Sequence, residues 1–300
     1  MKPAPFAYVR PTRLADVVGE LVAAEAAGGG KVLAGGQSLV PVLAMRLGRP
    51  RTLVDLTRVA ELGQIGHDGG SLRIGAAVRQ RHVERTAGGD VPLLAQALPW
   101  VGHREIRSRG TVCGSLAHAD PSAELPAVAL CLGATLDVAG PDGRRRIAAE
   151  EFFTGAMSTA LGPADVLASV QFPLARAGEG AGFAEVARRH GDFALAGVAA
   201  RVHLTDDGVH AADVATFGVA DRPQLRSLRG PLAEAVTRHG TDPDALGREL
   251  TEPAAAMAQD VVTTTGDAYA SPAYRRRLVT ALTPRALARA VAASRKRAAA

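Results

Sequence analysis

The sequence has 300 residues, of which 47% are hydrophobic and 22% charged, a balance that is typical of a folded globular protein and excludes a disordered chain. No segment resembles a membrane-spanning helix and the N-terminus has no apolar signal core, so we expect a cytoplasmic protein without a membrane span. The net charge is +5, but the arginines are scattered and only 4% of residues are aromatic, which argues against nucleic-acid binding. Two cysteines are too few for a disulfide framework or an iron–sulfur cage.

Residues 1–56 have the pattern of a small α/β unit. Apolar residues recur at helical spacing after Thr12, which can cap a helix, and three consecutive glycines at 28–30 end it. The expected elements are, in chain order, a helix with Leu14, Val17, Val18 and Leu21 on its buried side, a strand at 31–34, a helix at 39–47 and a strand that ends at Asp55.

Residues 57–174 indicate a second α/β unit. Cys131 falls in an apolar helix and is expected to be a small core residue. Arg144–Arg146 follow a Pro-Asp-Gly sequence and are expected on an exposed turn. The expected elements are a strand at 72–75, a helix from Pro92 toward Trp100, a long loop at 102–121, a buried helix at 125–132 and strands at 135–138, around Ile147 and at 166–172.

The segment 173–182, PLARAGEGAG, is rich in glycine and predicts a linker. Strands of an antiparallel sheet are expected after it, at 183–186, 193–204 and 209–219, with a hairpin turn at Asp206-Asp207-Gly208. Two or three helices should follow, the last at 271–295. The predicted fold class is therefore α+β: a two-part α/β domain over residues 1–174, divided near residue 56, and a smaller domain of antiparallel sheet packed with helices over residues 182–295.

The first segment with a chemical signature is Ala34-Gly35-Gly36-Gln37-Ser38, between a strand and a helix that starts at Leu39. Two glycines allow a sharp turn with bare N–H groups, Ser38 adds a hydroxyl, and the following helix presents its positive end. These features suit a pyrophosphate, although an ordinary strand-to-helix turn has the same shape. The pattern is neither a Rossmann fingerprint nor a P-loop.

The second segment runs from Ile106 to Glu124 and is rich in small and hydroxyl residues. Thr111 and Ser115 can bind phosphate oxygens, as can backbone N–H groups near Gly114. Asp120 or Glu124 could accept hydrogen bonds from ribose hydroxyls. Glu124 could equally cap a helix that begins near residue 125.

Together the two segments resemble the FAD-binding segments of the medium, flavin-carrying subunit of the molybdenum hydroxylases, the family of xanthine dehydrogenase and aerobic carbon monoxide dehydrogenase. There the first loop reads Ala-Gly-Gly-His/Gln-Ser-Leu, and the second reads Ile-Arg-x-x-Gly-Thr-x-Gly-Gly-Ser/Asn, followed by Ala-Asp-Pro and an acid. Segments 6–11, 53–56, 151–155 and 188–194 are also typical of the family. Cys113 replaces the usual first glycine of the second loop, which indicates that this position needs no glycine-only dihedral angle.

The resemblance implies a two-part FAD-binding domain of the PCMH type, with no catalytic residue and no metal ligand in this chain. The flavin ring would lie between the two domains, beside Phe193 with Arg188 or Arg189 nearby, and Asp120 and Glu124 would lie near the ribose or ribityl hydroxyls. The remaining implied contacts are around the pyrophosphate, from Ala34, Gly35, Gly36, Gln37, Ser38 and Leu39 on one side and Thr111, Val112, Cys113, Gly114 and Ser115 on the other.

The same resemblance implies partner subunits. A large subunit would oxidise the substrate on a molybdopterin cofactor, and a small iron–sulfur subunit with two [2Fe–2S] clusters would pass the electrons to this FAD. NAD, oxygen or a quinone would accept them, and the complex would be a dimer of heterotrimers. Two alternatives remain open: a stand-alone FAD-dependent reductase on the same fold, such as the enolpyruvyl-sugar reductase of cell-wall synthesis, and a flavin-free scaffold subunit.

Four residues have simple interpretations. Cys113 and His118 are close in sequence, but two ligands are too few for a structural zinc site. Trp100 is expected in the core or at an interface instead of stacking on the flavin. Gly36 is expected to be glycine because a side chain would block the pyrophosphate.

Overall fold

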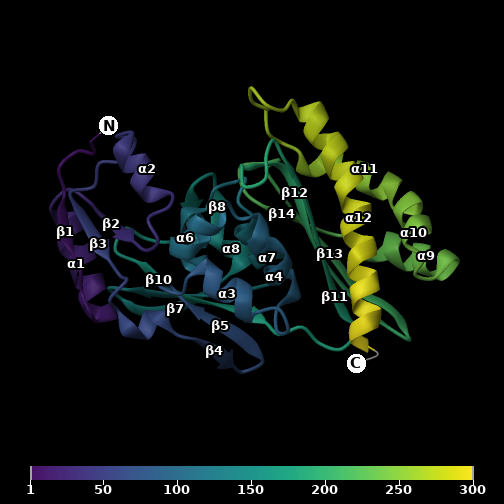
Figure 1. Ribbon diagram of the computed structural model, residues 1–300, viewed down its shortest axis with the longest axis horizontal. Coiled ribbons are helices and arrows are strands. Elements are labelled where there is room, and N and C mark those ends of the chain that lie inside the picture. The colour runs from purple at the N-terminus through teal and green to yellow at the C-terminus, as the bar shows by residue number, and fades with distance from the viewer. Residues whose placement is uncertain (1, 299–300) are drawn as a thin grey trace.

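The computed structural model describes residues 2–298 and confirms the α+β class (Figure 1). Its N-terminal part is a three-stranded parallel sheet in the order β1 (Ala7–Val9), β3 (Thr52–Asp55) and β2 (Gly30–Leu33). Helix α1 (Leu14–Ala26) packs on this sheet and buries the expected apolar residues, with the exception of the half-buried Val18. The expected Thr12 cap is wrong, because Arg13 is the N-cap and makes no side-chain cap bond. Helix α2 (Leu39–Ala44) ends three residues earlier than expected.

The middle of the chain forms an antiparallel sheet in the order β4-β5-β10-β6-β7. Short helices cover it, among them α7, whose eight residues are all buried. The elements are η1 (Ala60–Gly63), β4 (Ile65–Asp68), β5 (Ser71–Gly75), α3 (Gln80–Thr86), α4 (Pro92–Ala97), η2 (Leu98–Trp100), α5 (Arg104–Arg109), α6 (Val112–His118), α7 (Glu124–Cys131), β6 (Thr135–Gly140), β7 (Gly143–Ala148), α8 (Ala149–Phe152), β8 (Phe153–Gly155), β9 (Ser158–Thr159) and β10 (Val166–Pro173).

Two expectations for this region are wrong. The expected loop at 102–121 contains α5 and α6, which Gly110 separates. Arg144–Arg146 do not lie on a turn but in strand β7, paired with β6, and their side chains form ion pairs with Glu61, Asp165 and Asp137.

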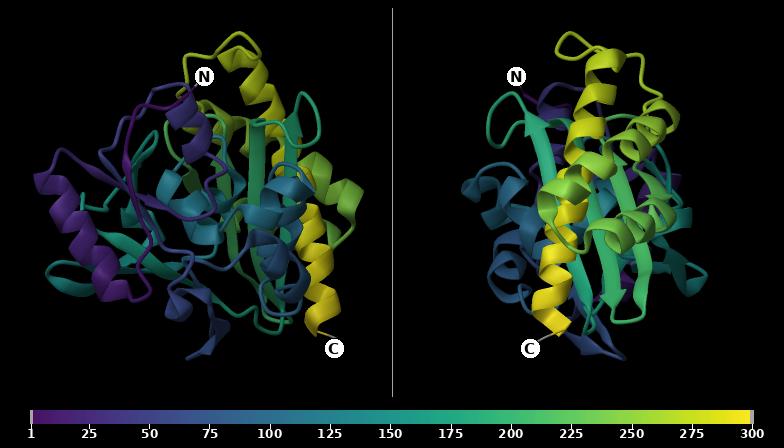
Figure 2. Two further views of the ribbon diagram at one scale, coloured as in Figure 1. Left: turned by 60° about the vertical axis from the view of Figure 1, so that its left-hand side comes forward. Right: turned by 90° about the vertical axis from the view of Figure 1, so that its right-hand side faces the viewer.

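The C-terminal part is a four-stranded antiparallel sheet, β11 (Glu179–Ala187), β12 (Ala194–Thr205), β13 (Gly208–Phe217) and β14 (Gln224–Ser227), in that order. The hairpin turn between β12 and β13 is confirmed. Four helices follow in the described residues, not two or three: α9 (Arg229–His239), α10 (Pro243–Glu249), α11 (Thr251–Val261) and α12 (Pro272–Ala298). The long α12 lies across one face of this sheet (Figure 2).

The connection between the two domains is shorter than the expected linker at 173–182, because β10 extends to Pro173 and β11 begins at Glu179, which leaves residues 174–178 outside the strands. Gly180 and Gly182 lie inside β11, where a Cβ on either would collide with backbone oxygens of α12. These glycines therefore allow a helix to pack closely on a strand, and they are not signs of flexibility.

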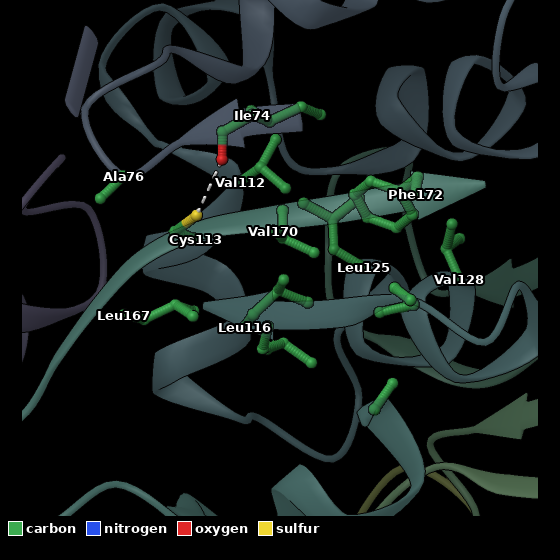
Figure 3. Packing of buried hydrophobic residues seen from close by; sticks show 14 of the residues in the cluster. Ile74, Ala76, Val112, Cys113, Leu116, Leu125, Val128, Leu167, Val170 and Phe172 are labelled. Atoms are coloured by element: carbon green, nitrogen blue, oxygen red, sulfur yellow. Dashed lines mark hydrogen bonds between the residues drawn. The ribbon is translucent and has the colours of Figure 1, made fainter. Parts of the chain in front are cut away.

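The core of the middle region surrounds α6 and α7 (Figure 3). Cys113 lies in this core and its thiol donates to the carbonyl oxygen of Ile74 over 3.5 Å. Cys131 is 2% exposed, which confirms the expectation that it is a core residue. Burial raises the pKa of both thiols to about 12, so they are neutral and unreactive at neutral pH. No helix among the described residues is long and apolar enough to cross a bilayer.

Candidate cofactor site

The two glycine-rich segments lie directly against each other although they are far apart in the chain. A Cβ on Gly35 would clash with the carbonyl oxygen of Arg109 and come within 2.7 Å of the Gly110 Cα. A Cβ on Gly114 would lie 3.6 Å from that of Ala34. The structure therefore brings the two predicted segments together as one surface of nearly bare backbone.

Residues of α3 hold the second segment in place. The backbone N–H of Gln80 donates to the carbonyl oxygen of Gly110 over 2.9 Å, and its side-chain amide donates to that of Thr111 over 3.3 Å. The Arg79 guanidinium donates to the carbonyl oxygen of Arg109. Sequence reasoning missed both Gln80 and Arg79, the N-cap of α3, since only the fold brings them beside this loop.

In the first segment, Gly36 has a φ of +75°, a left-handed conformation that disfavours any side chain. A Cβ there would also lie 3.3 Å from side-chain atoms of Leu33 and Val40. The backbone alone therefore explains this glycine, and its role in making room for a pyrophosphate stays a prediction. Ser38 is exposed at the N-cap of α2 and makes no cap hydrogen bond, so its hydroxyl is available to a ligand.

In the second segment, Thr111 is the N-cap of α6, and its hydroxyl accepts a hydrogen bond from the Gly114 N–H over 3.0 Å. The side chains of Val112 and Cys113 point into the core, so only their backbone could contact a cofactor. Cys113 lies within a helix and has no positive φ, in agreement with the expectation that this position does not require glycine. Ser115 is only partly buried.

The two predicted acids follow α6 directly. Asp120 accepts a hydrogen bond from the Ser122 N–H over 2.8 Å. Glu124 is the first residue of α7 and is 6% exposed; its side chain does not cap the helix, whose N-cap is Ala123. Burial raises the pKa of Glu124 to about 7, the charge of Asp120 contributes in the same direction, and Arg107 opposes it.

The loop at 188–193 of the C-terminal domain contacts the N-terminal domain beside the second glycine-rich segment. His190 of this loop stacks on Trp100 at 5.7 Å between ring centroids and on His103 at 6.5 Å. Trp100 thus packs between the two domains. Phe193 is 69% exposed, and its ring is open to contact.

The predicted cations of this loop are both exposed. The guanidinium of Arg188 lies 4.5 Å from the centroid of the Tyr269 ring, a contact that holds it on the C-terminal domain. Unlike Arg188, Arg189 stacks on no aromatic ring among the described residues. Across residues 2–298 no three His, Cys, Asp or Glu residues are arranged to hold a metal ion.

These groups suit a dinucleotide. N–H groups around Gly35 and the hydroxyls of Ser38 and Ser115 match the needs of a diphosphate, because they can donate hydrogen bonds without a bulky side chain in the way, whereas the Gly114 N–H already donates to the Thr111 hydroxyl. The acids near residue 120 can accept hydrogen bonds from sugar or ribityl hydroxyls.

Comparison with known proteins also indicates an FAD-binding chain. The family model for the FAD binding domain in molybdopterin dehydrogenase matches residues 4–175, and the model for the CO dehydrogenase flavoprotein C-terminal domain matches residues 181–290. The caffeine dehydrogenase subunit beta of Pseudomonas sp. (strain CBB1) is 33% identical over 97% of this chain and 96% of its own length. The nicotine 6-hydroxylase medium subunit of Paenarthrobacter nicotinovorans is 33% identical over 97% of this chain and 99% of its own.

Solved structures are also similar. A chain of quinoline 2-oxidoreductase from Pseudomonas putida 86 matches with a TM-score of 0.86 and 32% identity, covering 99% of this chain and 100% of its own. A chain of reconstituted CO dehydrogenase from Oligotropha carboxidovorans matches with a TM-score of 0.87 and 29% identity, covering 98% and 100%. The fold, the paired glycine-rich segments and these matches show that the chain belongs to the FAD-binding flavoprotein family of the molybdenum hydroxylases and is an oxidoreductase subunit.

Proposed function

We propose that this chain is the electron-transfer subunit of a heterotrimeric molybdenum-containing dehydrogenase. Its bound FAD would receive electrons from an iron–sulfur subunit and pass them to the final electron acceptor. The observation that carries the proposal is the contact of Gly35 with Arg109 and Gly110, which makes one cradle from two distant segments. The relatives named above, described as medium or beta subunits of dehydrogenases and hydroxylases, support the same role.

The residues of this chain would bind and orient the cofactor. Backbone N–H groups of residues 35–38, with the hydroxyls of Ser38 and Ser115, would hold the diphosphate. Asp120 and Glu124 would accept hydrogen bonds from hydroxyls along the cofactor. Phe193 and Arg189 would lie by the ring, where a positive charge favours the reduced, anionic form. When bound, FAD supplies the ability to accept electrons singly and to release them in pairs.

The partners follow from this role. A large subunit would hold the molybdopterin cofactor and the substrate, and a small subunit would hold two [2Fe–2S] clusters, for which this chain has too few cysteines. NAD, oxygen or a quinone would be the acceptor, the assembly would be a dimer of heterotrimers, and its location would be the cytoplasm. The carbon monoxide, caffeine and nicotine enzymes among the relatives suggest that one flavoprotein design serves many substrates.

The experiment is to purify the complex after co-expression with the coding sequences next to this one, and to measure visible flavin absorbance and the subunits present. The double variant Ser38→Ala/Ser115→Ala should lower the FAD content of a folded complex. Ser108→Ala is the matched control, because that exposed hydroxyl donates only to the Arg104 carbonyl of its own helix. A wild-type complex without flavin would support the scaffold alternative, and a flavin-containing chain that reduces its own substrate without partners would support the stand-alone reductase.

A further inference from the structure

A polar cavity lies on the antiparallel sheet of the middle region, on the face that points away from α6. Ile74 of β5 and Val170 of β10 lie in the core beside α6 (Figure 3). Arg73 and Gln171, which alternate with them along the two strands, therefore point to the opposite face and line the cavity. Its volume is about 310 Å³, at the lower end of the range for ligand sites. The sheet separates this cavity from the cofactor cradle, which includes α6.

The lining of the cavity has a surplus of two positive charges. Its charged residues are Asp68, Asp137, Arg73, Arg144, Arg145 and Arg146. The Asp137 carboxylate already accepts hydrogen bonds from the Ser169 hydroxyl over 2.7 Å and from the Gln171 amide over 3.1 Å. It also accepts one from Nε of Arg146 over 3.0 Å. These contacts occupy Asp137, so it does not neutralise the other arginines.

Arg73 is the unpaired cation of this cavity. No carboxylate among residues 2–298 forms an ion pair with its guanidinium, whereas the other three arginines each have an acidic partner. Its neighbours across the sheet are Gly66 on β4 and Gln171 on β10, and neither carries a charge. Gly66 leaves open space opposite it, since a Cβ there would meet no atom within 4 Å. The half-buried Arg73 guanidinium is therefore free to bind an anion that enters the cavity.

Two more guanidiniums can contribute to the same site. Arg146 uses only Nε in its contact with Asp137, which leaves its two Nη groups available. The ion pair of Arg144 with Glu61 is 3.4 Å long and both side chains are more than half exposed, so it is weak. Arg145, by contrast, is fixed by two hydrogen bonds to the Asp165 carboxylate.

We propose that this cavity is a binding site for a phosphate group, with Arg73 as the principal donor and Arg144 and Arg146 as further donors. A guanidinium presents several N–H groups in one plane, an arrangement that matches the oxygens of a phosphate. A dianionic phosphate would also balance the surplus of two positive charges, which a single carboxylate would not. The phosphate would be either the free ion or the phosphate of a nucleotide. This site does not depend on the proposed FAD site, because it lies on the other side of the sheet.

Phosphate binding is measured on the full chain at low ionic strength, from the line width of the inorganic phosphate signal in phosphorus NMR. A saturating amount of FAD is added so that the cradle is filled. Arg73→Met keeps the apolar stem but removes the donors, and it should weaken phosphate binding by about tenfold or more. Arg248→Met removes the same charge from an exposed position of α10 and should leave the affinity unchanged. No saturable binding to wild type, or equal binding to Arg73→Met, would overturn the proposal.

A second variant tests the position of the anion. Residues opposite each other in an antiparallel pair have their side chains on the same face, so Gly66→Glu would place a carboxylate beside Arg73. The new ion pair should abolish phosphate binding in a chain that still folds, as thermal unfolding would show. Gly230→Glu adds the same charge at an exposed position of α9 and is the control. A folded Gly66→Glu chain that binds phosphate as well as wild type would overturn the assignment.

The two sources of the phosphate are distinguished by titration with AMP in place of inorganic phosphate. Tighter binding of AMP than of phosphate, lost in Arg73→Met, would identify the phosphate of a nucleotide as the ligand. Tighter binding of inorganic phosphate, lost in the same variant, would identify the free ion. A chain that takes up no FAD would contradict the proposed function and leave the dependence of phosphate binding on Arg73 intact.

Discussion

Arg107 forms a two-pronged ion pair with Glu84, with Nε to Oε2 at 3.0 Å and Nη2 to Oε1 at 3.1 Å. Arg107 is only 6% exposed. The pair joins α5 to α3, and the second glycine-rich segment begins within α5. Although burial opposes ionisation of Glu84, the hydrogen bonds from Arg107 and Arg81 hold its pKa below the usual value. The pair thus anchors one half of the cofactor cradle to the helix beside it.

Replacement of Arg107 should lower the stability of the folded chain. Arg107→Met is expected to lower the free energy of unfolding by about 3 kcal/mol, because it breaks a buried pair. Arg81→Met, which removes the more exposed partner of Glu84, should cost less than about 1 kcal/mol. Urea unfolding of the two variants measures both values, and equal losses would contradict the assigned importance of Arg107.

The contact between the two segments predicts that alanine substitutions at Gly35 and Gly36 lower both stability and FAD occupancy. Gly35→Ala should destabilise the chain by about 1–3 kcal/mol and lower FAD occupancy, because the new Cβ clashes with backbone that cannot move aside easily. Gly36→Ala should cost about 1–2 kcal/mol for its left-handed backbone and also lower occupancy in a folded protein.

The control for both variants is Gly19→Ala. Gly19 lies at an exposed position of α1 with open space around it, so alanine should stabilise the helix by about 0.5–1 kcal/mol. Thermal unfolding and bound-flavin absorbance measure the two effects. Full FAD occupancy in Gly35→Ala would argue against the cradle.

Phe193 offers a test of where the flavin ring lies. Because its side chain is 69% exposed, Phe193→Ala should leave the stability of the apoprotein unchanged. It should nevertheless shift the flavin absorbance spectrum or potential in the complex if the ring lies beside it. Leu47→Ala, at another exposed apolar residue, is the control and should leave the flavin unaffected. A silent Phe193→Ala would place the ring elsewhere.

Periodic patterns predicted the elements that local sequence determines. The buried side of α1 and the hairpin after Thr205 were predictable because helical spacing and a turn sequence act over a few residues. Strand β7 was predicted only around Ile147; its first half was not, because its three arginines hide the alternation and only pairing with β6 defines it. Helices α5 and α6 were missed because each is short: Gly110 follows α5 directly, and α6 contains Gly114 and Ser115, so the sequence resembles a loop.

In the candidate site, too, local features were predictable from the sequence and contacts between distant elements were not. The two segments were predictable from their residues, since bare backbone near hydroxyls is a local property. Their mutual contact and the support from Gln80 arise only when distant elements pack, and so does the burial of Glu185 in β11. A lone glutamate in a strand gives no sign of what it faces, and a glycine such as Gly182 looks like a linker until a helix lies against it.

The raised pKa of Glu185 predicts how stability depends on pH. The folded chain holds a proton there up to pH about 9, whereas the unfolded chain releases it near its ordinary value. The native state therefore binds more protons between these limits, and the stability contributed by this proton falls as pH rises through that window. Glu185→Gln cannot ionise, so its advantage over wild type should grow from pH 5 to 9, by at most about 1.4 kcal/mol per pH unit. Urea unfolding across this range, with Glu20→Gln at an exposed position of α1 as control, measures the difference; a difference that stays constant with pH would show that Glu185 does not hold the proton.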